Sequence, residues 1–346
     1  MKVLQVIDTL NVGGAERVCV DLSNLLIDDG VDVGLLLISD QGELVKKLNE
    51  KVNIFFLNRT SKFDLTVLSK LRNIIKKYDI IHVHMRFTFR YVKLFSLLFR
   101  INKPIVLHDH FGSIGFDKSI PFLMNSLLKP NYYIGVSEEL TIWARKNLKL
   151  KKNNIYLLKN IVVKDSVRNE FYIDKSKDTI VLVANIKPVK NQFFAIQLIE
   201  HTKYNLDIYG NILDEDYYNF LVDYIKTKKL HNRVTFIHNE INIQSKLHQY
   251  LFGLHVAKSE SGPLVLIEFL AQRLPFVTYN TGEVVNLIKN ELPFFVNDFS
   301  FDSWLKKIEV VKKYDTKILN DVYLRFFNPQ NYLKECKKIY QEIINF

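Results

Sequence analysis

Hydrophobic residues follow two alternating periods along this chain. Short, almost wholly apolar runs such as 2–8 are followed by longer segments such as 15–30, in which apolar residues recur every three or four positions. The first pattern is typical of a strand buried on both faces, and the second of an amphipathic helix. Their alternation predicts a doubly wound α/β fold with parallel sheets. The strands are expected at residues 2–8, 31–38, 52–57, 78–84, 104–112, 131–137, 155–162, 179–184, 205–209, 233–237, 251–257 and 275–279.

A polar, charged segment at 166–177 separates two such series of strands and helices, and it is expected to be a linker. A chain of 346 residues is long enough for two domains of ordinary size. We therefore expect one domain at 1–165 and a second at 178–328. Pro329 follows the second domain and precedes a last amphipathic helix at 330–346.

The segment from 258 to 278 is expected to run from a loop through a buried helix into a strand. Gly262 can cap this helix, and Pro263 suits its first position because proline lacks the N–H that would be unpaired there anyway. The helix is apolar nearly all round, so it should be buried, yet it contains Glu268. A buried carboxylate needs a partner, because without one it costs several kcal/mol or takes up a proton.

Two interpretations of Glu268 stay open at this level. In the first, Glu268 binds the hydroxyl groups of a ligand such as a ribose, while the N–H groups of Leu264 and Val265 and the helix dipole hold an anion. Glu260, eight residues ahead of Glu268, then supplies a second carboxylate. That arrangement suits a nucleotide diphosphate carrying a sugar. In the second interpretation, this is a capped core helix whose glutamate is paired inside the protein.

Composition and charge narrow the class of protein. Two cysteines, Cys19 and Cys336, argue against a disulfide framework and for a reducing compartment. The N-terminus leads directly into a strand without a signal-peptide pattern, and we find no apolar run of about 18 residues that would span a membrane. The formal charge of +11 lies mostly in residues 1–177, which hold 28 Lys and Arg against 18 Asp and Glu. That half is expected to face an anionic partner.

Residues 86–103 combine cations with aromatic side chains and contain no acid. A basic, aromatic, amphipathic helix can lie on an anionic membrane surface, and a partly buried helix with a solvated basic face is the alternative. The cations of this segment are Arg86, Arg90, Lys93, Arg100 and Lys103.

Histidines end two of the predicted strands. His82 and His84 lie two residues apart on one strand, so they face the same side and are a possible metal pair. No third ligand is evident nearby in the sequence, and we therefore expect these two side chains to line a site without metal. The next strand ends in His108, Asp109 and His110, any of which can form a hydrogen bond to a hydroxyl group.

Two loops follow predicted strands at the carboxyl ends, where ligands of doubly wound folds bind. The first holds Gly13 and Gly14, but its spacing is not that of a dinucleotide fingerprint, so it does not indicate NAD. A tight strand-to-helix turn is the alternative for this loop. The second runs from Asn185 to Asn191 and holds Lys187 and Lys190, which are either anion ligands or a solvated lysine pair.

Five motifs together resemble the retaining GT-B glycosyltransferases of family 4. They are Gly-Gly-Ala-Glu-Arg after the first strand, His-Val-His, His-Asp-His, Lys-Pro-Val-Lys-Asn, and Glu260 and Glu268 separated by seven residues. The resemblance implies two Rossmann-like domains facing a cleft, with the final helix returning to the first domain. It also implies transfer of a sugar from a nucleotide-sugar donor with retention at the anomeric carbon.

The resemblance assigns roles to individual residues. Donor binding falls on Lys187, Lys190, Glu268 and the turn of Gly262, Leu264 and Val265, with Glu268 on the ribose and the turn amides on the phosphates. Glu260 approaches the donor sugar, and the catalytic set is His110, Glu260 and Lys190. On the acceptor side lie Gly13, Gly14, His84 and His110. His110 is chosen over His108 by its position after the strand, with Asp109 as the alternative.

The chain departs from the family pattern at three places. Asn185 stands where the family has an early Arg on the diphosphate, which leaves Lys187 to supply that charge. Gly210-Asn211-Ile212 keeps only the first glycine of the usual pair, and His238 replaces a glycine near the base. These departures leave the base of the donor undetermined.

The resemblance further implies a UDP-sugar donor, no metal or other cofactor, and a glycan or lipid-linked acceptor in cell-surface polysaccharide synthesis. We expect a cytoplasmic protein that contacts the inner face of the cell membrane peripherally through its basic first domain, and that does not bind nucleic acid. Two alternatives are a nucleotide-sugar epimerase of the same fold and a non-enzymatic basic nucleic-acid-binding protein. The first would convert donor without an acceptor, and the second would bind strands with steep salt dependence.

Overall fold

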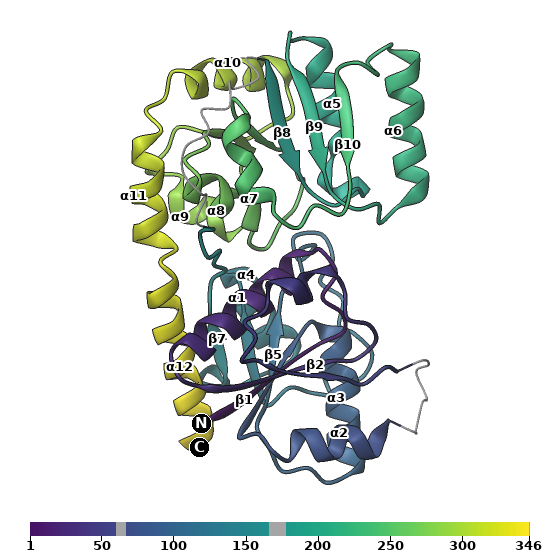
Figure 1. Ribbon diagram of the computed structural model, residues 1–346, viewed down its shortest axis with the longest axis vertical. Helices are drawn as coiled ribbons and strands as arrows, with labels where there is room; N and C mark the ends of the chain where they lie inside the picture. Colours follow the sequence, from purple (N-terminus) through teal and green to yellow (C-terminus); the bar gives the residue numbers. More distant parts are fainter. Residues whose placement is uncertain (60–66, 166–177, 346) are drawn as a thin grey trace. The chain divides into compact units, whose positions relative to one another are not determined.

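The computed structural model describes residues 1–59, 67–165 and 178–345 (Figure 1). The chain forms two compact units. Unit 1 comprises residues 1–161 together with the segment from Pro329 onward, and unit 2 comprises 162–328. The predicted linker at 166–177 lies outside the described residues. The apolar period of Leu65, Leu68, Leu71 and Ile74 predicts a helix at 64–78, and its first residues, 64–66, lie outside the described residues as well.

Unit 1 is built around a parallel sheet in the order β3-β2-β1-β4-β5-β6-β7. All its strand pairs are parallel, and the central strands are buried along nearly their whole length, as the continuous apolar runs predicted. The strands are β1 (Lys2–Ile7), β2 (Asp32–Leu37), β3 (Asn53–Phe56), β4 (Ile80–His84), β5 (Ile105–Asp109), β6 (Tyr132–Gly135) and β7 (Ile155–Leu157).

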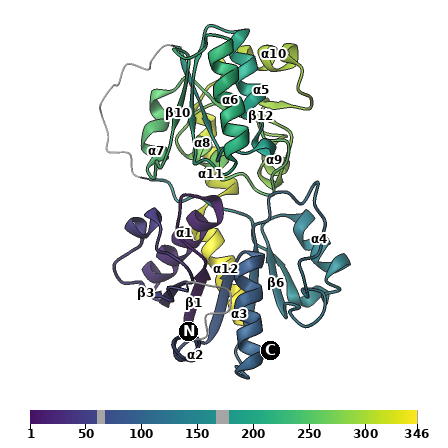
Figure 2. The same ribbon diagram turned by 90° about the vertical axis from the view of Figure 1, so that its right-hand side faces the viewer.

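Helices cover both faces of this sheet (Figures 1 and 2). Helices α1 (Gly14–Asp28) and α12 (Pro329–Asn345) pack against each other on one face, and α3 (Arg86–Leu98) lies on the other. Ser137 is the N-cap of the helix that begins at Glu138, because its Oγ accepts the Leu140 N–H at 3.3 Å. The other helices are α2 (Leu68–Ile75), α4 (Glu138–Asn147), and the short 3₁₀ turns η1 (Glu43–Lys47) and η2 (Lys152–Asn154).

Unit 2 repeats this architecture with a parallel sheet in the order β10-β9-β8-β11-β12-β13. Helices α5 and α6 lie on one face of it and α8 on the other (Figures 1 and 2). The strands are β8 (Thr179–Val183), β9 (Asn205–Tyr209), β10 (Val234–Ile237), β11 (Gly253–His255), β12 (Phe276–Tyr279) and β13 (Phe295–Val296). The helices are α5 (Gln192–Glu200), α6 (Glu215–Thr227), α7 (Ile243–Lys246), α8 (Leu264–Ala271), α9 (Glu283–Ile288), α10 (Phe301–Lys312), α11 (Lys317–Phe326), η3 (Pro188–Lys190) and η4 (Leu247–Gln249).

Each sheet changes direction at one point, and that point predicts where ligands bind. In unit 1 the chain builds outward from β1 to β3 and then returns to place β4 on the other side of β1. In unit 2 the same reversal lies between β8 and β11. Loops diverge at the carboxyl ends of such strand pairs, so ligands of doubly wound sheets bind there. The doubly wound α/β class predicted from the sequence is confirmed.

Several predicted element bounds were wrong, each for a local reason. The helix expected at 86–103 ends at Leu98 because Phe99 leaves helical geometry and Arg100 has a left-handed φ of 50°. The strand expected at 155–162 ends at Leu157, where its pairing with β6 stops. Helix α8 begins at Leu264, so its N-cap is Pro263 and not Gly262. Proline's fixed φ suits either position, and here its ψ of 109° is extended.

Candidate active site

The reversal point of unit 2 brings together the two charged residues predicted for catalysis. Lys190 lies in the loop after β8 and Glu260 in the loop after β11, and their side chains form an ion pair. Both are largely buried, with side-chain exposures of 17% and 13%. A backbone hydrogen bond of 2.9 Å from Lys258 to the Val189 carbonyl ties the two loops together. The predicted cation and carboxylate therefore share one site.

A histidine that the sequence reading did not single out supports Glu260. His255 ends β11 and is buried; its Nε2 lies 3.5 Å from Glu260 Oε1, and its Nδ1 lies 2.8 Å from the Thr278 hydroxyl. Burial would raise the pKa of Glu260, but Lys190 and His255 outweigh burial and lower that pKa to about 2. Glu260 is thus a carboxylate at every physiological pH.

Lys187 lies at the start of the same turn, where it caps η3 and is half-buried. Burial and the neighbouring Lys190 lower the pKa of Lys187, while Glu260 opposes that shift. Both lysines and Glu260 therefore act on one another electrostatically. Asn185, which stands at the early Arg position of the family, is used structurally, because its Oδ1 accepts the Asn211 N–H at 3.0 Å. Lys187 and Lys190 are the two cations of this turn.

Helix α8 is buried along all eight residues, including Glu268, which is 2% exposed. Its first turn holds Leu264 and Val265, directly after the Glu260–Pro263 turn that contains Gly262. The first N–H groups of an α-helix have no partner within the helix, and the dipole there favours an anion. Glu260 and the start of α8 thus lie on one continuous loop beside Lys190.

Gly282 packs against this turn and holds it in place. The loop after β12 contacts the turn here, because the Glu283 N–H donates to the Ser261 carbonyl at 2.8 Å. Gly282 has a φ of 85°, and a Cβ added there would lie 2.9 Å from Pro263 Cδ and 3.2 Å from Glu260 Cβ. Only glycine adopts this backbone readily while allowing so close an approach.

The end of β10 carries His238 where the family has a glycine. Its Nδ1 lies 2.7 Å from the Gly210 carbonyl, so the imidazole fastens the loops after β9 and β10 to each other. The ring also lies parallel to that of Phe236, with centroids 6.4 Å apart. This contact gives His238 a structural role between these two loops.

In unit 1 the reversal point gathers four histidines. His82 and His84 project from β4, and His108 and His110 come from β5 and the residue after it. Ring centroids of neighbouring members lie 4.1–5.3 Å apart, and His82, His84 and His108 are fully buried. Burial is the main cause that lowers the pKa of His82 and of His110 to about 3, and it lowers the pKa values of the other two well below their usual range. All four are neutral at pH 7.

The expectation that no third metal ligand lies near His82 and His84 was wrong. His108 is beside them, because β4 and β5 pair in parallel with His84 opposite His108, and ring nitrogens of all three lie within 4.8 Å. In tetrahedral zinc sites ligand nitrogens converge on one ion and lie about 3.3 Å apart. Here His82 Nε2 bonds to His108 Nδ1 at 2.9 Å, and both nitrogens of His84 bond elsewhere. Apart from His108 Nε2, the ring nitrogens of these three histidines form hydrogen bonds.

His110 and its alternative Asp109 have different roles. Asp109 is fully buried, and its oxygens accept hydrogen bonds from Arg86 Nε at 2.8 Å, the Tyr133 hydroxyl at 2.6 Å and the Phe111 N–H at 3.1 Å. Its carboxylate is therefore occupied within the protein. His110 is only partly buried, so it is the member of the cluster that reaches the surface of unit 1.

The ion pair between Arg86 and Asp109 shows that Arg86 does not belong to a solvated basic face of α3. Arg86 has a side-chain exposure of 10%, is paired with Asp109, and stacks on Trp143 with its guanidinium carbon 3.9 Å from the ring centre. The surface of α3 is instead apolar, with Phe87, Leu94 and Leu98 exposed by 47%, 42% and 67%. Every helix among the described residues is too short or too polar to cross a bilayer.

Gly13 and Gly14 form the start of α1 at the same reversal point of unit 1. Gly13 is the N-cap, with extended backbone at φ −160°, and the Glu16 side chain folds back towards it. Burial raises the pKa of Glu16, an effect that Asp8 reinforces and a backbone hydrogen bond opposes. Both glycines thus lie where the loop after β1 enters α1.

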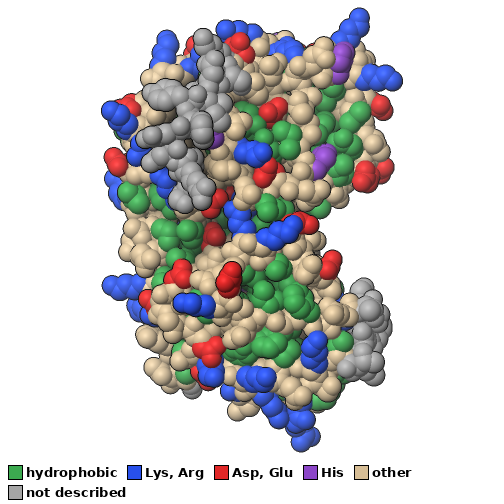
Figure 3. All heavy atoms as spheres, viewed as in Figure 1, with side chains coloured by type: hydrophobic (Ala, Val, Ile, Leu, Met, Phe, Trp, Pro, Cys, Tyr) green, Lys and Arg blue, Asp and Glu red, His purple; other side chains and the backbone are tan. Residues whose placement is uncertain are grey.

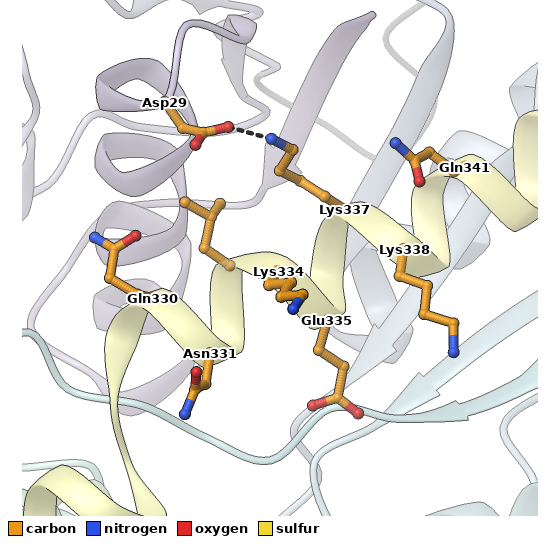
Figure 4. Close-up of a pocket in the computed structure, with 9 residues that line it drawn as sticks. Asp29, Gln330, Asn331, Lys334, Glu335, Lys337, Lys338 and Gln341 are labelled. Atoms are coloured by element: carbon orange, nitrogen blue, oxygen red, sulfur yellow. Dashed lines mark hydrogen bonds and ion pairs between the residues drawn. The ribbon is translucent and has the colours of Figure 1, made fainter.

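A separate groove of about 800 Å³ runs along α12 (Figure 4). It is lined by Asp29, which pairs with Lys337, and by polar side chains of α12 such as Lys334 and Gln341. None of the predicted site residues lines this groove. On the face viewed in Figure 3, basic and acidic side chains are interspersed, with hydrophobic side chains reaching the surface between them.

The family models divide the chain as its fold does. Residues 12–165 match the model described as Glycosyltransferase Family 4, and residues 163–321 match the model described as Glycosyl transferases group 1. An uncharacterized glycosyltransferase of Haemophilus influenzae is 24% identical, over 96% of this chain and 95% of that protein.

Solved structures share the whole architecture. HepE of Anabaena, crystallised with UDP and glucose, superposes with a TM-score of 0.82 at 15% identity, covering 99% of both chains. A variant of TarM from Staphylococcus aureus, in complex with fondaparinux, α-GlcNAc-glycerol and UDP, superposes with a TM-score of 0.77 at 11% identity, covering 98% of this chain and 99% of that one. The predicted two-domain architecture with a C-terminal helix is confirmed.

Proposed function

We propose that this chain, which has the fold of GT-B glycosyltransferases and matches a glycosyltransferase family model in each half, moves a sugar from a nucleotide-sugar donor to a hydroxyl group of a glycan or lipid-linked acceptor. The anomeric C–O bond to the diphosphate breaks and a C–O bond to the acceptor forms. The nucleoside diphosphate leaves, and the acceptor hydroxyl loses its proton. The observation that supports this most is the buried Lys190–Glu260 pair at the reversal point of unit 2.

In this proposal, donor binding breaks the ion pair between Lys190 and Glu260, and each side chain then contacts the donor instead. Without donor, Glu260 neutralises Lys190. A bound diphosphate would take over Lys190, together with Lys187 and the first N–H groups of α8, and would leave Glu260 to accept hydrogen bonds from sugar hydroxyls. Cations and amides aimed at the leaving diphosphate stabilise its charge, so the departure would need no metal. Glu268 would bind the ribose, and the transfer would retain the anomeric configuration.

UDP is the nucleotide we propose, since the related HepE and TarM structures hold UDP. Thermal unfolding of the protein with UDP, GDP, ADP or CMP, each with and without Mg²⁺, tests the donor site. We expect UDP alone to raise Tm, equally well without Mg²⁺, and the rise to be lost in Glu268→Gln. Glu309→Gln is the matched control, because Glu309 is an exposed carboxylate paired with Lys312 in the same unit. No shift with any nucleotide would contradict the proposal.

Retention is tested on the product. NMR of the new glycosidic linkage should show the anomeric configuration of the donor, and an inverted linkage would contradict that part of the proposal. Incubation of donor without acceptor distinguishes the epimerase alternative, which would convert the sugar while leaving it attached to the nucleotide.

On the acceptor side we propose that unit 1 lies peripherally on an anionic membrane on the cytoplasmic side, where lipid-linked glycans in surface polysaccharide synthesis would be found. The support is the exposed apolar face of α3, Phe87, Leu94, Leu97 and Leu98, with the cations Lys93 and Arg100 beside it. Arg86 is not part of this surface, because it is buried against Asp109.

Sedimentation with vesicles of anionic and neutral lipids tests this surface. We expect Leu97→Glu/Leu98→Glu to lose binding to anionic vesicles, and Leu324→Glu, an exposed leucine on helix α11 of unit 2, to keep it. Equal binding by all three proteins would remove this part of the proposal while leaving the donor site untouched.

A further inference from the structure

The four histidines of unit 1 belong to a longer chain of hydrogen bonds. His110 Nε2 lies 3.1 Å from His84 Nδ1, and His84 Nε2 lies 2.9 Å from Gln5 Oε1. The Gln5 amide nitrogen donates to the Tyr340 hydroxyl at 3.2 Å, and that hydroxyl lies 2.6 Å from His82 Nδ1. Strands β1 and β4, the residue after β5, and helix α12 therefore contribute to one connected network.

The Gln5 amide determines which group donates and which accepts in each of these hydrogen bonds. The Gln5 carbonyl oxygen only accepts, so the His84 nitrogen facing it must carry a hydrogen. A neutral imidazole has one N–H, so the other nitrogen of His84 is a bare acceptor. His110 must then donate from Nε2. Since His110 is neutral, its Nδ1 is left with a lone pair.

The other half of the chain runs the same way. The Tyr340 oxygen accepts from Gln5, and its own hydrogen is directed to His82 Nδ1. His82 then donates from Nε2 to His108 Nδ1 at 2.9 Å. His108 Nε2 ends the chain, and it is buried without a hydrogen-bond partner among the residues that the structure describes. Five groups thus donate in sequence, starting from His110 and ending with His82.

We propose that Gln5, His84 and Tyr340 are positioning residues that hold His110 in the tautomer with its hydrogen on Nε2, so that Nδ1 is a fixed acceptor for a hydroxyl group. If the Gln5 amide turned round, every donor in the chain would reverse, and His110 Nδ1 would become a donor. In the observed orientation the Tyr340 oxygen is the acceptor of the Gln5 amide N–H, so the placement of this amide depends on the Tyr340 hydroxyl. The identity of the hydroxyl group that His110 would contact rests on the proposed function. The tautomer of His110 does not depend on that function.

The fold explains why these groups meet. Gln5 on β1 pairs in register with His82 on β4, at the reversal point of the sheet. Tyr340 comes from α12, 335 residues along the chain from Gln5, and is fully buried. In so buried a place an amide or hydroxyl without a partner costs about 1–3 kcal/mol, so the hydrogen bonds hold one another in place.

Long-range ¹H–¹⁵N NMR of the protein with ¹⁵N-labelled histidine reads the tautomer directly and needs no donor. The His110 signals are assigned by their loss in His110→Gln. We expect wild-type His110 to carry its hydrogen on Nε2 between pH 6 and 8. In Tyr340→Phe the amide is free to turn, so His110 should show a mixture of tautomers or the Nδ1–H form. A wild-type His110 protonated on Nδ1, or no change in Tyr340→Phe, would overturn the proposal.

Tyr332→Phe is the matched control. Tyr332 lies on the same helix and is similarly buried, but its hydroxyl has no hydrogen-bond partner among the described residues. This variant loses the same atom and should keep the wild-type tautomer. If Tyr332→Phe changed the His110 signals as Tyr340→Phe does, the effect would come from helix packing and the proposal would fail.

Kinetics connect the network to the reaction once a donor and acceptor are found. We expect Tyr340→Phe to lower kcat about tenfold with KM changed less than twofold, whereas Tyr332→Phe leaves both unchanged. A normal kcat in Tyr340→Phe, with an altered tautomer, would show that the network does not serve the reaction. If no donor were ever turned over, the NMR result would still stand, and only the proposed function would fall.

Discussion

The histidine cluster makes unit 1 sensitive to mild acid, and the size of the effect follows from the structure. All four histidines of unit 1 lie in the cluster, so lowering the pH from 7.0 to 5.5 titrates no other histidine there. In the native protein their pKa values are about 3 for His82 and His110 and well below 6.5 for His84 and His108, so they stay neutral. In the unfolded chain each has its ordinary pKa near 6.5 and takes up a proton.

Stability therefore falls as the pH falls, because the unfolded state binds more protons than the native state. For one histidine that goes from mostly neutral at pH 7.0 to mostly charged at pH 5.5 only when unfolded, the loss is about 1.2 kcal/mol. Four independent histidines give about 5 kcal/mol, which is a large part of the stability of an ordinary domain. The carboxylates contribute little in this window, since their ordinary pKa values lie near 4.

The two tryptophans allow the units to be followed separately. Trp143 lies in unit 1 and Trp304 in unit 2. Urea unfolding of Trp304→Phe, followed by fluorescence at several pH values, reports unit 1, and Trp143→Phe reports unit 2, which holds none of the cluster. We expect the unit 1 midpoint to fall steeply between pH 7.0 and 5.5. A loss in unit 1 no larger than that of a single histidine would refute the assignment of four buried neutral imidazoles.

Three further predictions concern single residues. Gly282→Ala should destabilise unit 2 by about 1–2 kcal/mol in urea unfolding followed at Trp304, because alanine is strained at a φ of 85° and its Cβ would meet Pro263; an unchanged midpoint would contradict the close packing of this turn. Lys190→Gln should weaken UDP binding in calorimetry by about tenfold to a hundredfold, because a charge-assisted contact to phosphate is lost and Glu260 is left without its cation. Lys203 is exposed, so Lys203→Gln should bind UDP as the wild-type protein does. Cys19 and Cys336 should react with Ellman's reagent at pH 8 only after unfolding, because both thiols are fully buried and burial raises the pKa of Cys336 to about 12; rapid labelling of the native protein would show that this core opens.

The sequence by itself determined the elements and their order. The apolar runs and helical periods gave the strands and helices to within a few residues, because local periodicity reflects which side of an element is buried. Parallel strands end at a common edge of the sheet, so loops after strands were the expected place of a ligand site. Lys190 and Glu260 were assigned to one donor site by a family resemblance, and they form one ion pair.

The tertiary structure alone decided the partners. No spacing in the sequence joins Tyr340 to Gln5 and His82, pairs Arg86 with Asp109, or places His255 and Thr278 behind Glu260. The sequence places His108 at the end of a predicted strand. Assigning it to a cluster with His82 and His84 requires knowing that β4 and β5 are neighbours and which residues pair between them. Contacts of this kind depend on sheet order, on register and on the packing of a distant helix. Those are set by the free energy of the whole buried core, whereas the pattern of a short segment reports only its own exposure.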